Sequence, residues 1–296
     1  MKPIMNQQKK IEVTVYDDAR EFLRHTEQLF AADETKNNLI LGLALRLREN
    51  PQAFSLAKPL LCTVRDPRGT VRAAGVMTPP FPLVVYSDPP DLTALGALAE
   101  ALAAGNWQVS GVNGVDVVSD AFANLWEKKS GERAQLVSNS RAYELRQVIN
   151  VAYPSGAMRQ ARAGEASLGV DLLNVMMDEI DLEPRREFSP QEVSAMIERE
   201  NVFFWEDDGK VVSVTIVIRP QIQGICLSGV YTPLSFRKKG YARALVAEVS
   251  RAMLARGYRL TNLFTDLSNP TSNKIYQEVG YKPVCDYHQY RFQKSR

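Results

Sequence analysis

Three consecutive cations and a glycine occupy residues 237–240, within the stretch FRKKGYARAL. An apolar run, ICLSGVY, precedes them and a helical pattern follows, so they are expected at the start of a helix. A helix start presents unsatisfied N–H groups and the positive end of the helix dipole, which attract phosphate. Gly240 lets the backbone approach a ligand closely. Because Arg237, Lys238 and Lys239 add charge around the same point, we predict an anion site that suits a diphosphate.

The loop RKKGYA matches neither the pattern GxxxxGK[ST] nor the pattern GxGxxG, so a nucleoside triphosphate or NAD site is not supported. It fits the pattern [R/Q]-x-x-G-x-[G/A] of the acetyl-CoA-dependent N-acetyltransferase superfamily, called GNAT. A second motif, N-P-x-S-N-x-x-Y-x-x-x-G-Y from Asn269 to Tyr281, agrees with that family in order and spacing. Residues 158–296 therefore resemble a GNAT domain, and look most like the branch that includes glycine N-acyltransferases.

The resemblance implies a role for each matched residue. Backbone groups at the end of the central strand would pair with the pantetheine arm of CoA, and the N–H groups of the next loop would hold its pyrophosphate. Two asparagines would contact the pantetheine or fix the start of the last helix, and a tyrosine would protonate the departing thiolate. In that order, the residues are Val230, Tyr231 and Thr232; Arg237, Lys238, Lys239, Gly240, Tyr241 and Ala242; Asn269 and Asn273; and Tyr276.

The implied reaction transfers an acetyl or other acyl group from acetyl-CoA to a primary amine by direct attack. A strand amide near Val230 or Tyr231 would polarise the thioester carbonyl, and Tyr276 would be the general acid. Some relatives carry a glutamate early in the central strand as general base, but that stretch here is QGICLSG. The base stays open between Glu206, Asp266 and a chain of water molecules. Since the strand carboxylate is missing, the alternative is a non-catalytic acyl-CoA sensor or interaction module.

Hydrophobic periodicity predicts a mixed α/β fold, and the resemblance implies a mixed, mostly antiparallel sheet flanked by helices. The second half reads as two helices followed by β-β-β-α-β-α-β, and the first half repeats this plan more weakly. A shift of 149 positions places Ser119 on Ser268, for example. We therefore predict two tandem GNAT-like domains, residues 1–150 and 151–296, joined by a linker at 149–156. This duplicated layout is similar to that of mycothiol synthase.

The first half lacks the features of the anion site. At the position facing RKKGYA it reads YSDPPDLTAL, with prolines and aspartates instead of the glycine and the cations. Asp88 and Asp91 would repel a diphosphate, and the prolines remove N–H donors. Glu127 stands opposite Tyr276. We expect residues 1–150 to keep the fold, to bind no CoA and to wall off the acceptor site.

The overall composition is that of a globular protein. The 36 Lys and Arg residues against 34 Asp and Glu are too balanced to indicate a nucleic-acid partner. Three widely spaced cysteines and two histidines show no metal-site spacing, and the odd cysteine number suits a reducing compartment. The N-terminal lysines lack the apolar segment of a secretory signal, and no apolar run approaches the roughly 20 residues that a bilayer requires. We expect a cytoplasmic protein without metal or membrane.

The partner implied by the resemblance is a small-molecule or peptide amine. The segments that shape the acceptor site in this superfamily, residues 165–200 and the loop near 219–224, carry no recognisable motif. Free amino acids, polyamines, protein N-termini, lysines and aminoglycosides all stay open at this point. The sequence also leaves the oligomeric state open.

Overall fold

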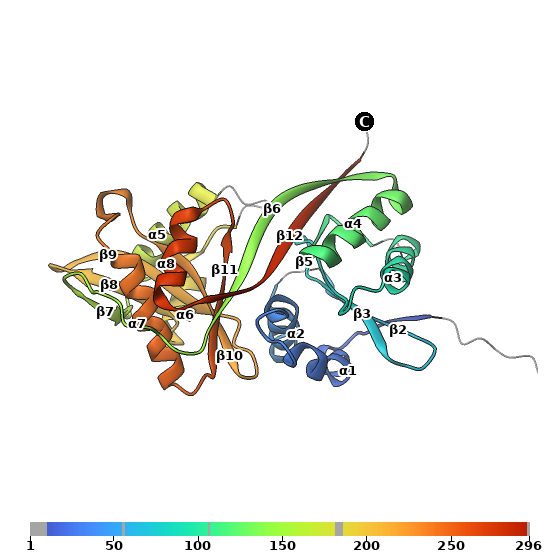
Figure 1. The fold of residues 1–296 in the computed structure, drawn as a ribbon, viewed down its shortest axis with the longest axis horizontal. Coiled ribbons are helices and arrows are strands. Elements are labelled where there is room, and N and C mark those ends of the chain that lie inside the picture. The colour runs from blue at the N-terminus through green and yellow to red at the C-terminus, as the bar shows by residue number, and fades with distance from the viewer. Residues whose placement is uncertain (1–10, 55–56, 106, 181–185, 295–296) are drawn as a thin grey trace, which may run out of the picture. The chain divides into compact units, whose positions relative to one another are not determined.

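A computed structural model describes residues 11–54, 57–105, 107–180 and 186–294. These residues form two compact units, the first comprising residues 1–140 and 285–296 and the second residues 141–284. Each unit contains a mixed sheet flanked by helices (Figure 1), so the predicted α/β class is confirmed. The basic N-terminal segment, for which no secretory signal was predicted, lies outside the described residues.

The second unit contains the elements predicted for the second half of the sequence. They are β7 (Ala157–Gln160), α5 (Ala166–Ile180), α6 (Pro190–Glu198), β8 (Val202–Asp207), β9 (Lys210–Ile218), β10 (Gly224–Tyr231), the 3₁₀ turn η1 (Leu234–Phe236), α7 (Tyr241–Ala255), β11 (Leu260–Asp266) and α8 (Pro270–Val279), together with the end of β6 (Glu132–Leu145). The strand order is β6-β11-β10-β9-β8-β7. Strands β7 to β10 pair antiparallel, whereas β10 and β11 are parallel.

Two hydrophobic cores lie on the two faces of this sheet. Leu245 of α7 shares one core with Leu227 of β10, and Val279 of α8 belongs to the same core. Leu173 of α5 shares the other core with Ile216 of β9. Because successive strand residues point to opposite faces, β10 is buried on both sides and its register is tightly specified.

The first unit shows the same succession of elements. They are β1 (Glu12–Val15), α1 (Ala19–Ala31), α2 (Asn38–Glu49), β2 (Leu60–Arg65), β3 (Val71–Met77), β4 (Leu83–Tyr86), α3 (Leu92–Ala104), β5 (Gly111–Val115) and α4 (Asp116–Ser130), together with most of β12 (Lys282–Lys294). The strand order is β1-β2-β3-β4-β5-β12 followed by residues 132–140 of β6, and only β4 and β5 pair in parallel among the strand pairs described for this unit. An origin by duplication stays a prediction.

Each sheet includes a strand from the other half of the sequence. Residues 287–291 of β12 pair antiparallel with 111–115 of β5 (Figure 1), which assigns the C-terminal segment to the first unit. Strand β6 neighbours β11, and its residues 141–145 belong to the second unit. The structure thus divides the chain after Ser140 and after Val284, whereas a single boundary at residue 150 was predicted. The two divisions differ because β12 and the end of β6 belong to the units that contain the strands beside them.

The segment 149–156, predicted as an inter-domain linker, belongs to the second unit instead. The ring of Tyr153 stacks on Trp205 with 6.1 Å between the ring centroids. The Trp205 indole N–H donates to the carbonyl oxygen of Ser155 at 2.9 Å. These aromatic and polar contacts hold the segment against β8.

The parallel pair β10 and β11 is joined only over its first three residues. Ladder pairs connect 224–226 to 260–262, and none connects the described residues farther along the two strands. On its other side, β10 carries a bulge, since its register with β9 shifts between Ser228 and Tyr231 and Gly229 has a φ of +63°. The carboxyl ends of β10 and β11 therefore lie beyond their shared ladder, at the kind of position where open α/β sheets bind ligands.

Candidate active site

The loop between β10 and α7 has the backbone shape of an anion site. Lys238 and Gly240 both adopt left-handed conformations, with φ of +64° and +87°. Gly240 is the N-cap of α7 and offers no side-chain cap to the first N–H groups of the helix. A Cβ at Gly240 would meet only the Arg243 Nη2 atom, at 3.5 Å. The start of α7 is therefore open to an external anion.

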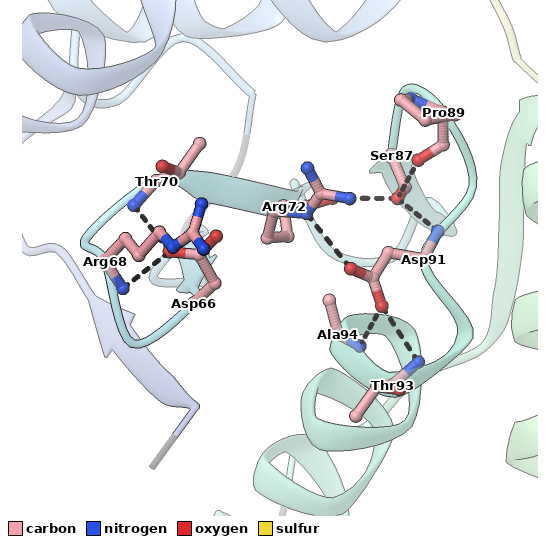
Figure 2. A network of polar contacts seen from close by, with 9 residues as sticks. All are labelled: Asp66, Arg68, Thr70, Arg72, Ser87, Pro89, Asp91, Thr93 and Ala94. Atoms are coloured by element: carbon pink, nitrogen blue, oxygen red, sulfur yellow. Dashed lines mark hydrogen bonds and ion pairs between the residues drawn. The ribbon is translucent and has the colours of Figure 1, made fainter. Parts of the chain in front are cut away.

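The corresponding helix of the first unit is closed by its own carboxylate (Figure 2). Asp91 is the N-cap of α3, and its Oδ1 atom accepts hydrogen bonds from the N–H groups of Thr93 and Ala94, both at 3.0 Å. Its Oδ2 atom accepts from Arg72 Nε of β3, also at 3.0 Å. The Ala94 N–H and, more weakly, Arg72 hold the pKa of Asp91 below its ordinary value. This carboxylate occupies the place of a bound anion.

A serine completes that closed network. Ser87 Oγ accepts from the Asp91 N–H at 2.9 Å and donates to the Arg72 carbonyl oxygen at 2.8 Å (Figure 2). Ser87, Asp91 and Arg72 therefore hold one another in place at the start of α3. The N–H groups of Thr93 and Ala94 at this helix start have hydrogen-bond partners without a ligand.

The cations of the predicted site differ in what they contact. Arg237 Nη2 donates to Glu179 Oε2 at 2.6 Å, and Arg237 Nε donates to the Thr232 carbonyl oxygen at 2.8 Å. Lys238 and Lys239 are exposed, and Lys239 Nζ lies 5.9 Å from the centroid of the Phe236 ring. The Arg237 guanidinium is thus engaged by the protein, whereas both lysine side chains reach into solvent.

Glu179 of α5 was not among the predicted site residues, because residues 165–200 carry no recognisable motif. Its Oε1 atom accepts from the Tyr231 hydroxyl at 2.9 Å, and its Oε2 atom accepts from Arg237. Arg237, more than Tyr231, holds the pKa of Glu179 below its ordinary value. One carboxylate therefore joins α5 to both the end of β10 and the start of the loop.

Replacing Glu179 by glutamine is expected to lower stability near neutral pH and to have a smaller effect near pH 3. The lowered pKa means that the carboxylate stabilises the fold above its unfolded-state pKa, and that this contribution disappears as the pH falls through the folded-state pKa. Since both side chains are more than one third exposed, we expect a loss of only about 0.5 kcal/mol. Denaturant unfolding at the two pH values measures it.

The control for Glu179→Gln is a double-mutant cycle with Arg237→Gln, which isolates the ion pair from each side chain's other contacts. We expect the coupling free energy to be smaller near pH 3 than near neutral pH. A coupling that is equal at both pH values would contradict the ion-pair interpretation.

Tyr276 of α8 lies within a cluster of tyrosines. Its ring centroid is 6.4 Å from that of Tyr143 and 6.0 Å from that of Tyr281. The hydroxyls of those two neighbours are hydrogen-bonded, whereas the Tyr276 hydroxyl bonds to no residue that the structure describes. Burial and, after it, the nearby Cys226 thiol raise the pKa of Tyr276 above its ordinary value. Tyr276 is therefore a protonated phenol with an unused donor.

The two predicted asparagines both hold the start of α8. Asn269 is the N-cap, and its Oδ1 atom accepts from the Ser272 N–H at 3.0 Å. Asn273 Nδ2 donates to the carbonyl oxygens of Asp266 and Asn269, both at 2.8 Å. Asn273 Oδ1 accepts from the Tyr143 hydroxyl at 2.9 Å. Of the two roles left open for them, the structure shows the fixing of the helix start; contact with pantetheine stays a prediction.

The three residues predicted to meet the pantetheine arm stand at the end of β10. Val230 lies within the bulge, where the register with β9 is interrupted. The Tyr231 carbonyl oxygen accepts from Ser213 Oγ at 2.9 Å, and Thr232 Oγ1 is hydrogen-bonded to the same serine hydroxyl. The strand end is thus anchored to β9 on one side.

The first turn of α7 holds a further cation that the sequence analysis missed. Tyr241 is buried and its hydroxyl donates to Asp207 of β8, while Ala242 adds only a methyl group. Arg243 Nη1 donates to Glu278 at 2.9 Å, but Arg243 Nε is buried without a partner among the described residues. A cation in the first turn of a helix interacts unfavourably with the helix dipole unless an anion lies nearby. The arginine at this position in FRKKGYARAL is therefore a sequence signal that could have indicated Arg243.

The two carboxylates considered as general base both accept local hydrogen bonds. Glu206 lies on β8, two strands away from β10, and its Oε2 atom accepts from Arg159 Nε at 2.6 Å. Asp266 Oδ1 accepts from the Ser268 N–H at 2.6 Å in the turn after β11. Both carboxylates are engaged in local hydrogen bonds. Of the three alternatives for the general base, the chain of water molecules is the one that these hydrogen bonds do not affect.

Within the described part of the chain, no group of three or more His, Cys, Asp or Glu side chains could hold a metal ion. No helix there combines the length and the apolar character needed to cross a bilayer. The three cysteines are free thiols.

The comparisons agree with this fold. Residues 172–281 match the model of the acetyltransferase (GNAT) family, and the matched range contains every predicted site residue from Val230 to Tyr276. A GCN5-related N-acetyltransferase from Sphaerobacter thermophilus is 16% identical over 96% of each chain, with a TM-score of 0.64. A GNAT-family acetyltransferase from Colwellia psychrerythraea is 14% identical over 95% of this chain and 100% of its own, with a TM-score of 0.60.

A comparison with curated proteins finds no match. At identities this low, the solved structures show a shared fold, whereas the family model addresses the sequence of the second unit directly. Residues 172–281 are a GNAT acetyltransferase domain, and the predicted family is confirmed.

Proposed function

We propose that the second unit transfers an acetyl or other acyl group from acetyl-CoA to the primary amine of a small molecule or peptide. The observation that carries this proposal is the open start of α7, with left-handed backbone at Lys238 and Gly240, next to the end of the β10–β11 ladder. Such a helix start suits a diphosphate, and the adjoining strand end suits an extended arm. A cytoplasmic location, where free thiols persist, is part of the proposal.

In this proposal the loop and the helix start hold the cofactor. The backbone N–H groups of residues 237–242 bind the pyrophosphate, and Lys238 and Lys239 add charge from solvent. The Arg243 guanidinium adds a cation beside Gly240, since a Cβ there would meet its Nη2 atom at 3.5 Å. The pantetheine arm follows the end of β10 as an added strand, with its thioester near Val230.

The reaction proceeds by direct transfer. The amine nitrogen attacks the thioester carbonyl carbon, whose oxygen is polarised by a strand N–H near Val230 or Tyr231. The C–S bond then breaks, the amide forms, and the Tyr276 phenol donates its proton to the departing thiolate. Water carries away the proton that the amine loses and returns one to Tyr276. The products are the N-acylated acceptor and CoA.

The first unit is proposed to bind no CoA. Its α3 start is filled by the Asp91 carboxylate, and the same network engages Arg72, the cation that would otherwise face a phosphate. A diphosphate would have to displace a charged cap from two N–H groups and an ion pair. One acetyl-CoA per chain is therefore expected.

Thiol release from acetyl-CoA in the presence of an amine panel tests the function, and calorimetric titration gives the stoichiometry. We expect one bound acetyl-CoA and amine-dependent thiol release. Saturable acetyl-CoA binding with no thiol release across the panel would favour the sensor alternative, which the missing β10 carboxylate supports. Two bound molecules per chain would contradict the closed state of the first unit.

A further inference from the structure

Three of the five buried polar atoms that lack a hydrogen-bond partner among the described residues lie together in the second unit. They are Arg219 Nε, Gln221 Nε2 and Asn262 Oδ1, which belong to the turn between β9 and β10 and to β11. Buried polar groups are satisfied in the great majority of cases, so each exception calls for a partner. Three exceptions at one place indicate a molecule that the protein itself does not supply.

Hydrogen bonds and strand pairing connect these residues into one cluster, which we call the orphan cluster. Asn262 Nδ2 donates to Gln221 Oε1 at 2.9 Å, and Arg219 Nη2 contacts Cys226 Sγ at 3.0 Å. Cys226 and Asn262 are direct partners in the ladder between β10 and β11. Asn262 is fully buried and Gln221 is 8% exposed, so solvent does not satisfy them.

The chemistry of the orphan cluster does not depend on which way the two amides are turned. Gln221 and Asn262 share one hydrogen bond, so exchanging nitrogen and oxygen in both leaves one N–H donor and one oxygen acceptor without a partner. Arg219 adds a second donor and a permanent positive charge. Its backbone has a φ of +48°, a costly conformation for a non-glycine residue that is typical of functional sites.

The orphan cluster lies on the two strands between which the proposed function places the pantetheine arm. The Cys226–Asn262 pair is the last pair of the β10–β11 ladder, and beyond it the strands continue without shared ladder pairs. The Cys226 thiol is one of the groups that raise the pKa of Tyr276, the proposed general acid. A ligand held at Asn262 would therefore lie where the shared ladder ends, toward the start of β10 from Val230.

We propose that the orphan cluster is the acceptor subsite and that the acceptor is a free α-amino acid. The acceptor carboxylate accepts hydrogen bonds from Arg219 Nε and from the unpaired amide N–H of the Gln221–Asn262 pair. The acceptor amine donates to the unpaired amide oxygen of that pair, so all three orphan atoms are satisfied at once. An amine without a carboxylate leaves two buried donors unpaired. We therefore expect it to react by the same chemistry but with a lower kcat/KM. This inference rests on the proposed function.

The test compares each standard amino acid with its decarboxylated amine, using the full chain, acetyl-CoA and thiol release. We expect at least one amino acid to exceed its matched amine about 100-fold in kcat/KM, as for sites built to bond a polar group. Equal values for every pair, or activity with the decarboxylated amines alone, would overturn the proposal while leaving the acyltransferase function intact.

Two variants assign that preference to the orphan cluster. Arg219→Met and Gln221→Met are expected to reduce the acid-over-amine ratio at least about 10-fold, while Gln223→Met, from the same loop, keeps it. Gln223 Oε1 accepts from Arg259 at 3.0 Å, and Gln223 contributes none of the three orphan atoms. Because the ratio is measured within one sample, partial unfolding of a variant leaves it unchanged. An unaltered ratio in both variants contradicts the assignment.

Calorimetry separates failure of the subsite from failure of the function. If the chain binds acetyl-CoA but releases no thiol, amino-acid binding to the CoA-loaded chain that is lost in Gln221→Met still supports the subsite. If acetyl-CoA does not bind, the proposed function fails, and amino-acid binding to the chain alone decides the subsite. A crystal structure at saturating amino acid that shows only water at the three orphan atoms overturns it.

Discussion

Tyr276→Phe is expected to lower kcat about 100-fold, within the usual range for loss of a general acid. The dissociation constant of acetyl-CoA should change less than about twofold, because the phenol acts on the departing thiolate and not on the bound thioester. Its hydroxyl has no partner among the described residues, so the unfolding free energy should stay within about 0.5 kcal/mol. Steady-state thiol release, calorimetric titration and denaturant unfolding measure the three quantities.

The matched control is Tyr281→Phe, in the same tyrosine cluster. The Tyr281 hydroxyl lies 2.9 Å from Ser250 Oγ and from Thr261 Oγ1, so its removal should cost about 1–3 kcal/mol of stability and leave kcat unchanged. Burial raises the pKa of Tyr276, so its phenol keeps its proton below about pH 10 and no alkaline fall in rate is expected there. An unchanged kcat in Tyr276→Phe would remove Tyr276 from the mechanism.

Gly240→Asp is expected to raise the dissociation constant of acetyl-CoA at least about 100-fold. The new carboxylate would stand at the N-cap of α7, as Asp91 stands at the N-cap of α3, and would both occupy the first N–H groups and repel the diphosphate. The φ of +87° adds backbone strain for any residue other than glycine. Calorimetric titration with acetyl-CoA measures the loss.

Gly240→Asn is the control for charge, because asparagine has nearly the same shape, tolerates a left-handed backbone and is neutral. We expect it to weaken acetyl-CoA binding by less than about 10-fold, since only geometry changes. Equal losses in the two variants would show that electrostatic repulsion contributes nothing at this helix start, and the contrast between the two units would need another cause.

The features that the sequence predicted well are governed by local rules. Ser189 and Asn269 each accept an N–H hydrogen bond as N-caps, each with a proline directly behind it. Gly280 ends α8 with a φ of +112°, as expected of a helix-terminating glycine. The β-β-β-α-β-α-β order of the second half is confirmed for the same reason, because alternation and helical spacing are read within a few residues.

Where local signals compete, the sequence pattern is misleading. The run VNGVDVV at 112–118 has the valine content of a strand, but α4 already begins at Asp116. Ser119 lies within that helix and donates its hydroxyl back to carbonyl oxygens of the preceding turn, among them that of Val115. Valines favour strands only weakly, and tertiary packing overrode that preference here.

The site features that escaped prediction depend on contacts between distant residues. Glu179 and Arg237 meet across 58 positions, and Gln221 meets Asn262 across 41. No spacing rule connects such residues, since the sheet and not the local chain brings them together. The backbone features of the anion site, by contrast, were readable because Gly240 and its neighbours act within a single turn.

The exchange of strands has a consequence for biosynthesis. Asn113 of β5 and Gln289 of β12, hydrogen-bonded at 3.0 Å, are 176 positions apart in the chain. While the ribosome makes the intervening residues, β5 presents an uncovered edge of the kind that promotes wrong pairing between chains. The first unit can therefore complete its sheet only after the second unit has been translated, and a nascent chain that stops short of β12 leaves the edge of β5 without its partner strand.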